Sequence, residues 1–400
     1  MDITNVLSNE ELYALATAEG SPSASIFSAY DTYEAFANYV SGIDSAAAAE
    51  LRNQFFAISM AWIDKEVYVE EAVDILEEQG FGTKESLAYA GMLRNLYVKV
   101  SNPVDPKFKG LQDGDVFSPY IVNKPQVSEL FYTFNADYQN YTTIDNLEAR
   151  TAFHSATGVS ELLAKQAEGL RNKFVEWVLD KKLECLNLLI NDENLKDSQV
   201  VEVPMDSFSN AELQNLSNAI DNIVSAMTLT SNGAFNMGSW KQRQRKDVLR
   251  VLIKPIIDNT AKNYITPYAF NDVVLKNGVQ KVYVENFGGL IPSKDGTLAN
   301  RLYVLRDSEG RAIGYKETEN GTTAYTGTVE FYDPNADVIA VIADKDIMKV
   351  MEQEGYVVEA IYNPRTRSTN LWASEANVGF FYDRQKNMVI IKKKKQQSND

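Results

Sequence analysis

The longest regular pattern of apolar positions in the chain runs from Val159 to Ile190, with no internal proline. Its apolar residues recur at helical spacing: Val159, Leu162, Leu163, Ala167, Leu170, Phe174, Trp177, Val178, Leu186 and Leu189. This pattern predicts one helix over residues 159–190, about 48 Å long at 1.5 Å per residue. Because most helices in globular proteins are about a third of that length, such a helix needs an elongated surface to lie on.

Residues 1–100 also show helical patterns. Ser8-Asn9-Glu10-Glu11 is typical of a capping box that opens a helix closing near Gly20, and Asp31-x-x-Glu34 predicts a second box. Ser45 followed by four alanines opens a third helical stretch, and Gly80 and Gly82 end the helical pattern that continues it. We expect a further helix over residues 84–98, with Leu87, Ala90, Leu93 and Tyr97 on one side.

The pattern changes after Asn102-Pro103, where proline and glycine become frequent. Residues 116–145 read as extended, aromatic-rich chain and predict a long hairpin. Two strands alone are marginally stable in water, so this hairpin must lie on its own body or on another copy. We expect the helical arm before it to be buried between copies as well.

The remainder predicts mixed helices and strands, so the fold class is α+β. A Ser209-x-x-Glu212 cap precedes a helix that reaches Met227, and residues 248–253, 279–284 and 338–342 predict strands. A three-stranded meander is expected over residues 301–306, 311–316 and 322–331. A helix is expected at 345–353, followed by strands at 356–362, 378–382 and 388–391, with a loop at 363–376. No internal repeat is visible.

Charge divides the chain unevenly. The formal net charge is -16, and residues 1–80 hold 15 acidic and two basic side chains, whereas the remainder holds 40 and 37. An acidic helical extension therefore precedes a nearly neutral body, which argues against a sequence-specific nucleic-acid reader. The basic run Lys392–Lys395 is interpreted as a solvated tail, with a weak phosphate contact as the alternative. No apolar run approaches the roughly 20 residues of a membrane helix, and no secretory signal is visible, so we expect a cytosolic chain.

Candidate chemistry is sparse. His154 and Cys185 are the only residues of their types, which excludes an intrachain disulfide and a Cys/His zinc site. We interpret His154 as a capping or surface residue and Cys185 as a structural thiol. There is no phosphate-binding loop, and the acidic segments at 307–309 and 333–337 lack the glycine that a calcium loop requires. Paired carboxylates remain as a possible acid chemistry. The sequence thus predicts no catalytic, cofactor-binding or metal-binding residue, and a protein that is not an enzyme.

The order of elements, namely a helical arm, a protruding hairpin, one long helix and a mixed α/β region ending in strands, resembles the major capsid (major head) protein of tailed bacteriophages. It is most similar to that of small short-tailed phages, with the Hong Kong 97-like fold. The resemblance implies an acidic helical N-terminal arm at 1–105, an extended-loop hairpin at 106–150 and the spine helix of a peripheral domain at 151–205. It further implies an axial domain at 206–344, and return strands of the peripheral domain with a basic tail at 345–400.

This resemblance implies self-assembly into an icosahedral head shell around packaged phage double-stranded DNA. The expected location is the virion capsid, assembled in host cytoplasm. Expected partners are other copies in pentameric and hexameric capsomers, a scaffolding protein, a portal and DNA in non-specific contact, with no membrane and no cofactor. We expect the acidic helices to engage basic residues of neighbouring copies or of a scaffold. The alternatives are another virion subunit, from tail or baseplate, and a carbohydrate-active hydrolase or binding module.

Overall fold

The computed structural model describes most of the 400 residues of the chain. The described residues are 7–18, 21, 24–27, 29–42, 45–67, 73–86, 92–99, 126–205, 209–229, 233–239, 243–259, 279–284, 287, 291–292, 298–299, 302–306, 312–316, 329–332, 335, 337–352 and 356–394.

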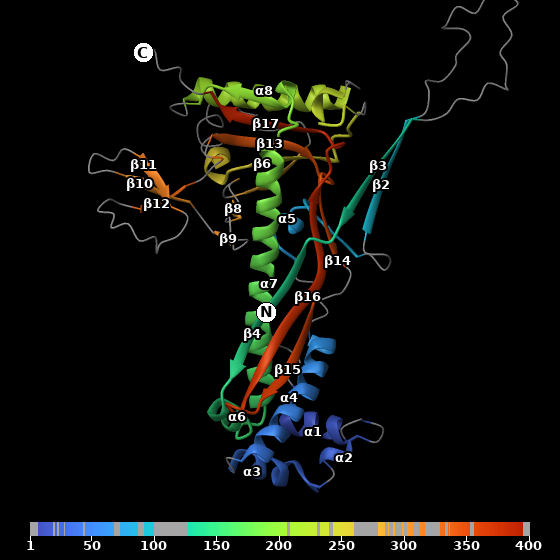
Figure 1. Cartoon of the computed structure of the whole chain (residues 1–400), viewed down its shortest axis with the longest axis vertical. Helices are drawn as coiled ribbons and strands as arrows, with labels where there is room; N and C mark the ends of the chain where they lie inside the picture. Colours follow the sequence, from blue (N-terminus) through green and yellow to red (C-terminus); the bar gives the residue numbers. More distant parts are fainter. Residues whose placement is uncertain are drawn as a thin grey trace, which may run out of the picture.

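The molecule is elongated, and its long axis is the helix α7 (Gly158–Ile190), as Figure 1 shows. This confirms the long helix expected from the apolar pattern. The other helices are α1 (Asn9–Thr17), α2 (Ala24–Phe27), α3 (Tyr33–Gly42), α4 (Ala46–Val67), α5 (Ile75–Glu78), α6 (Asn146–Ala152) and α8 (Asn210–Leu229), with the short 3-10 helices η1 (Asp197–Gln199) and η2 (Gly233–Phe235). Helices α1–α4 and α6 gather at one end of α7, and α8 crosses the other end (Figure 1).

A first sheet runs along α7 and is organised around β16 (Ser368–Tyr382), whose 15 residues pair with three other strands. One edge of β16 pairs first with β15 (Val357–Asn363) and then with β14 (Met348–Glu352), and the other edge pairs with β4 (Ala136–Ile144). The short β1 (Lys84–Ser86) adds a parallel strand beside β14.

A second sheet lies beneath α8, in the order β5-β17-β13-β6-β7. Its strands are β5 (Val200–Val203), β6 (Leu249–Ile253), β7 (Gln280–Tyr283), β13 (Val338–Asp344) and β17 (Met388–Lys393). One face packs on α8 and the other on the last turns of α7. Burial on both faces explains why β6 and β13 are almost entirely apolar, with Arg250 in β6 and the last residue of β13, Asp344, as the exceptions.

The remaining described strands form smaller sheets. They are β2 (Met92–Lys99) with β3 (Gln126–Thr133), β8 (Ile291–Pro292) with β9 (Leu298–Ala299), and β10 (Leu302–Arg306), β11 (Ala312–Lys316) and β12 (Val329–Tyr332). The expected meander is corrected in its order, because β10 lies between β11 and β12 and pairs with both.

Two helices expected from the sequence are strands. Residues 84–98 were expected to be helical, yet β2 pairs with β3 over its whole length, from Met92–Thr133 to Lys99–Gln126. Residues 345–353 were also expected to be helical, but β14 pairs with the end of β16, from Met348–Tyr382 to Glu352–Val378. In both cases pairing with a strand distant in sequence outweighs a weak local helical pattern.

The loop expected at 363–376 is also wrong, because β16 already begins at Ser368. Only a tight turn remains before it, in which Arg367 has a φ of 55°. A smaller correction concerns α3, whose cap is Thr32 and not Asp31: the Thr32 Oγ1 accepts from the Ala35 N–H. The hairpin expected over residues 116–145 is wrong in its pairing, because β3 pairs with β2 and β4 pairs with β16. Residues 116–125 of that expected hairpin lie outside the described residues.

The expectation that the helical arm is buried only between copies is wrong for the described helices. One cluster buries Leu12, Phe27, Phe36 and Phe55 with Phe153, which follows α6, and with Val159 at the start of α7. The capping boxes at Ser8 and Ser209 and the Ser45 cap are present as predicted. The N-terminal helices therefore form part of the body's own core.

Candidate assembly surface and hairpin root

The hairpin β2–β3 projects sideways from the body (Figure 1). Its register places Val98 opposite Val127 and Leu96 opposite Glu129, so alternate residues of both strands share a face. On the face turned away from the body, Leu96, Val98, Val127 and Phe131 are each 48–56% exposed. We call these four residues the outward face. Large apolar side chains gathered on one exposed face are typical of a protein–protein interface.

The opposite face of the hairpin contacts the body at the end of β16. The Tyr132 ring stacks on Phe381 with centroids 3.9 Å apart, and the Tyr97 hydroxyl donates to the Asp383 carboxylate. Burial, followed by the Asp383 carboxylate, raises the pKa of Tyr97, and burial also raises the pKa of Tyr132. Both phenols therefore stay protonated at physiological pH and can donate hydrogen bonds.

The exposed face of the hairpin continues onto the first sheet. Alternate residues of the chain from Val127 to Thr143 are exposed, through β3 and into β4. On β4, the Tyr141 ring stacks on Trp372 of β16, with ring centroids 4.6 Å apart. Strand β15, which pairs with β16, exposes Val357 and Ile361. One side of the sheet thus carries a second apolar area that is continuous in the chain with the outward face.

The hairpin root is the segment from α5 to β1, which precedes β2. Asp74 caps α5 by accepting from the backbone N–H groups of Leu76 and Glu77. The helix ends at Glu78, Gly80 follows with a φ of 73°, and Phe81 donates its N–H to the Leu76 carbonyl. Leu76 and Phe81 are both buried in one cluster, as expected where a glycine-terminated helix ends with a hydrophobic contact.

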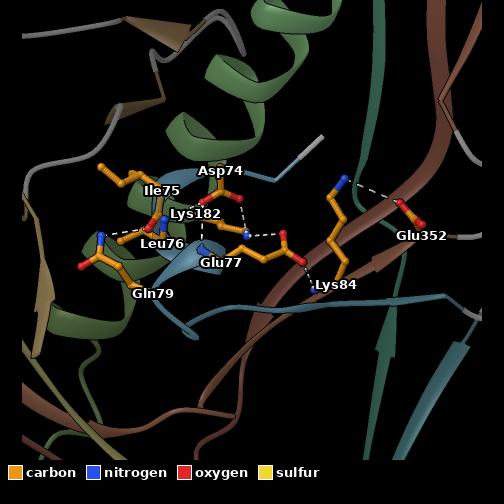
Figure 2. A network of polar contacts seen from close by, with 8 residues as sticks. All are labelled: Asp74, Ile75, Leu76, Glu77, Gln79, Lys84, Lys182 and Glu352. Carbon is orange, nitrogen blue, oxygen red and sulfur yellow. Dashed lines mark hydrogen bonds and ion pairs between the residues drawn. The ribbon is translucent and has the colours of Figure 1, made fainter. Parts of the chain in front are cut away.

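A network of charges joins this root to the long helix and to β14, and Figure 2 shows it. The Lys182 Nζ of α7 lies 2.5 Å from an Asp74 carboxylate oxygen and 3.3 Å from one of Glu77. The other oxygen of Glu77 accepts from the backbone N–H of Lys84, and the Lys84 side chain lies 3.8 Å from Glu352. Sequence reasoning missed Lys182, although it stands four residues from both Val178 and Leu186 on the apolar stripe.

A buried carboxyl group lies beside this network. Glu375 of β16 is 2% exposed, near Glu352 and Lys84. Burial, with a further contribution from the Glu352 carboxylate, raises the pKa of Glu375 to about 8, although Lys84 opposes the shift. Glu375 therefore holds a proton at neutral pH.

A cavity of about 410 Å³ lies between the hairpin, α7 and the end of β16. Its lining includes the apolar or aromatic side chains of Leu130, Tyr132, Leu188 and Phe380, and the charged side chains are Lys181, Glu184 and Arg384. Among the described residues that line the cavity, Glu184 is the one carboxylate, so they offer no carboxylate pair for acid–base chemistry.

The residues singled out from the sequence are placed as follows. His154 is exposed at the turn before α7. Cys185 is buried, and burial raises the pKa of its thiol to about 12, so it is an inert structural group. Lys392 of the basic run lies 3.9 Å from Asp337. Within the described residues, no three His, Cys, Asp or Glu side chains are arranged to hold a metal ion, and no helix is long and apolar enough to cross a membrane.

A family model described as "Phi29-like phage major capsid protein" matches residues 83–392. Among solved structures, a chain from the capsid of Staphylococcus phage Andhra is 12% identical with a TM-score of 0.53, and the match covers 82% of this chain and 88% of that chain. A chain from the structure of the head fiber and inner core protein gp22 of native bacteriophage P68 is 12% identical with a TM-score of 0.52, covering 82% and 86%. At such identities the likeness concerns the fold alone. No curated protein sequence matches the chain.

Proposed function

This chain belongs to the Phi29-like phage major capsid protein family, and from that membership we propose how its surfaces build a shell. It is a major capsid protein that forms the phage head shell, a structural component of the virion and not an enzyme. Its fold is the mixed α+β, Hong Kong 97-like capsid fold, with α7 as its long helix. The family match favours this function over the tail-subunit and carbohydrate-active alternatives.

Copies associate through the outward face of the hairpin. The observation that supports this is the exposure of Leu96, Val98, Val127 and Phe131 on a strand pair that lies to one side of the body. Leaving such a face in water is unfavourable, at about 25 cal/mol for each Å² of apolar surface. A neighbouring copy that covers it would supply the partner that an isolated hairpin lacks. Pentameric and hexameric capsomers would then form by repeating this contact.

The proposed division into domains follows the two larger sheets of the described residues. The peripheral domain comprises α7 with the β1-β14-β16-β15 sheet and β4, and the axial domain comprises α8 with the β5-β17-β13-β6-β7 sheet. Helices α1–α4 form a helical subdomain at the foot of α7, and the extended loop begins at β2.

The remaining proposed partners follow from charge. On the helical subdomain Glu10, Glu34 and Glu50 are exposed, while Arg52 is buried. This surface suits a basic region of a neighbouring copy, a scaffolding protein or a portal. The nearly neutral remainder of the chain suits a container that contacts packaged double-stranded DNA without binding it tightly.

The test is a charged substitution on the outward face. Phe131→Asp combined with Val98→Asp should abolish closed shells, because carboxylates would have to be desolvated at every contact. The subunit itself should fold normally, since both side chains lie on the face turned away from the body. Electron microscopy and sedimentation of the expressed protein measure shells and free subunits.

The matched control is Leu147→Asp, a similar change at an apolar residue of α6 that is 71% exposed at the foot of the molecule. The control should still form shells. Shells of normal yield from the doubly substituted hairpin would contradict the proposed contact.

A further inference from the structure

Lys182 stands where two hydrophobic cores meet. The buried residues of α7 from Val159 to Val178 belong to the core shared with α1–α4 and the first sheet. Those from Cys185 to Ile190 belong to the core beneath the second sheet. Lys182 lies between these two groups and is itself 0% exposed, so the long helix places a charge inside the molecule at the junction of its two halves.

The partners of this charge come from the hairpin root and not from either core. Asp74 uses one oxygen to cap α5 and the other to bind Lys182, so the helix and the ion pair share one carboxylate. Glu77 bridges Lys182 to the backbone of Lys84, the first residue of β1 (Figure 2). Lys182 therefore binds the start of the segment that leads into the hairpin directly and is linked to its end, at β1, through Glu77.

Stability alone is a weak reason for this arrangement. Desolvating a buried ion pair costs about as much as its attraction returns, and apolar groups of similar size often serve as well or better. What charges add is direction, because a carboxylate must sit at hydrogen-bond distance from the amine, whereas apolar contacts tolerate sliding. At this site the ion pairs would fix the orientation of α5 and β1 relative to α7.

We propose that Lys182 is a positioning residue that fixes the angle at which the hairpin leaves the long helix, by holding α5 through Asp74 and Glu77. Asp74 and Glu77 precede residues 83–392, the part that the family model matches. The ion pairs with Lys182 therefore connect this chain's own N-terminal segment to the part of the fold that the family model covers. Its consequence for shell assembly rests on the proposed function, but the angle itself is a property of the single subunit.

The angle can be measured in unassembled protein by pulsed electron paramagnetic resonance. Spin labels are placed at Val98→Cys on the hairpin and Glu168→Cys on α7, both exposed, with Cys185→Ala in the background. The parent should give one narrow distance distribution. Lys182→Met, which keeps the length of the side chain and removes its charge, should give a displaced or broadened one. An unchanged distribution would overturn the proposal.

Two further variants separate positioning from folding. Asp74→Asn keeps a side chain able to cap α5 but loses the ion pair, and it should broaden the distribution even if Lys182→Met does not fold. The triple variant Lys182→Met, Asp74→Asn, Glu77→Gln buries no net charge and should recover stability in urea without recovering the narrow distribution. If the triple variant returns to the parent distribution, the charges do not set the angle and the proposal is wrong.

The matched control is Lys173→Met, which removes an exposed ion pair with Glu176, 2.6 Å long and within α7 itself. It should leave the distance distribution unchanged, and a change equal to that of Lys182→Met would overturn the assignment to Lys182. Shell yield is recorded alongside. If the hairpin substitutions leave assembly intact while Lys182→Met still alters the distance, the proposed contact between copies fails and the positioning role stands.

Discussion

Asn9 is the residue through which the N-terminal helices hold the start of the long helix. Its side chain is fully buried, donates to the carbonyls of Ala152 and Ser155, and accepts from the backbone N–H of Val159. Thr157 at the N-cap of α7 makes no side-chain cap of its own, so Asn9 supplies from α1 what the helix lacks locally.

Asn9→Ala should therefore destabilise the subunit by about 2 kcal/mol, because it leaves buried backbone groups without partners. Urea unfolding measures this. Glu10→Ala at the exposed neighbouring position is the control and should change stability by less than about 0.5 kcal/mol. Equal effects of the two substitutions would show that Asn9 does not cap α7.

Glu375 predicts a pH dependence of stability. Its pKa is raised from 4.5 to about 8 in the folded protein, so between these values the folded state binds a proton that the unfolded state has lost. Its contribution to stability is therefore full below pH 4.5 and is lost as the pH rises towards 8.

Glu375→Gln should remove this decline, because a neutral amide does not titrate. Comparing the urea unfolding free energies of the two proteins in steps from about pH 5 to pH 8 measures the difference. The free energy of unfolding of the variant should increase relative to that of the parent as the pH rises. Parallel pH profiles of the two proteins would contradict the conclusion that Glu375 is buried and protonated. Lys84 and Glu352, the charged groups that face Glu375, are unchanged in both proteins.

Among the elements, the hairpin root depends on the backbone of Gly82. Its φ is 65°, a conformation that side-chain-bearing residues rarely adopt, and a Cβ there would meet Met348 at 3.5 Å and the Lys182 side chain at 3.6 Å. These are ordinary contact distances, so the backbone conformation, and not a clash, demands glycine.

Gly82→Ala should destabilise the subunit by about 1 kcal/mol through this strain. Gly169→Ala is the matched control: it lies in α7 with open space around its Cβ, and it should stabilise by about 0.5–1 kcal/mol. Thermal unfolding of both variants should show a lower melting temperature for Gly82→Ala and a higher one for Gly169→Ala than for the parent. A stabilising Gly82→Ala would contradict the turn described for the root.

The elements that the sequence predicts correctly are those whose pattern is sustained or closed by a local cap. Helix α7 has its long apolar stripe, and α8 has the Ser209 and Glu212 cap. Strands β6 and β13 are apolar except for Arg250 and Asp344, because both faces of their sheet are covered. Strands β2 and β14 were missed because their identity depends on partners distant in the chain, Gln126–Thr133 and Val378–Tyr382. The marginal stability of two strands already indicated that a hairpin needs a partner. Only the register of β2 and β3 showed that Val98 and Phe131 share a face.

At the scale of the whole molecule, the excess of acidic side chains in residues 1–80 can be related to the fold. Glu10, Glu34 and Glu50 lie on helices that pack on the foot of α7, so deleting residues 1–80 would expose Phe153 and Val159 and prevent folding. Reversing exposed charges is the sharper experiment. Glu10→Lys, Glu34→Lys and Glu50→Lys together should leave the fold intact and lower shell yield, because a basic partner would be repelled.

This effect should weaken as salt is added, since exposed charges are screened over about 10 Å at 0.1 M ionic strength. Light scattering of assembling protein across a salt series measures it. Glu202→Lys on β5, exposed outside the helical subdomain, is the control and should assemble as the parent does. Unchanged assembly of the triple variant would contradict a role of the acidic helices in contacts between subunits.

We propose that copies of this capsid protein hold one another through the outward face of the hairpin. Cryo-electron microscopy of shells assembled from the purified protein would show this contact. Val98 and Phe131, each about half exposed in the single subunit, are expected to be buried against a neighbouring copy in every capsomer. Closed shells in which this face remains open to solvent would contradict it.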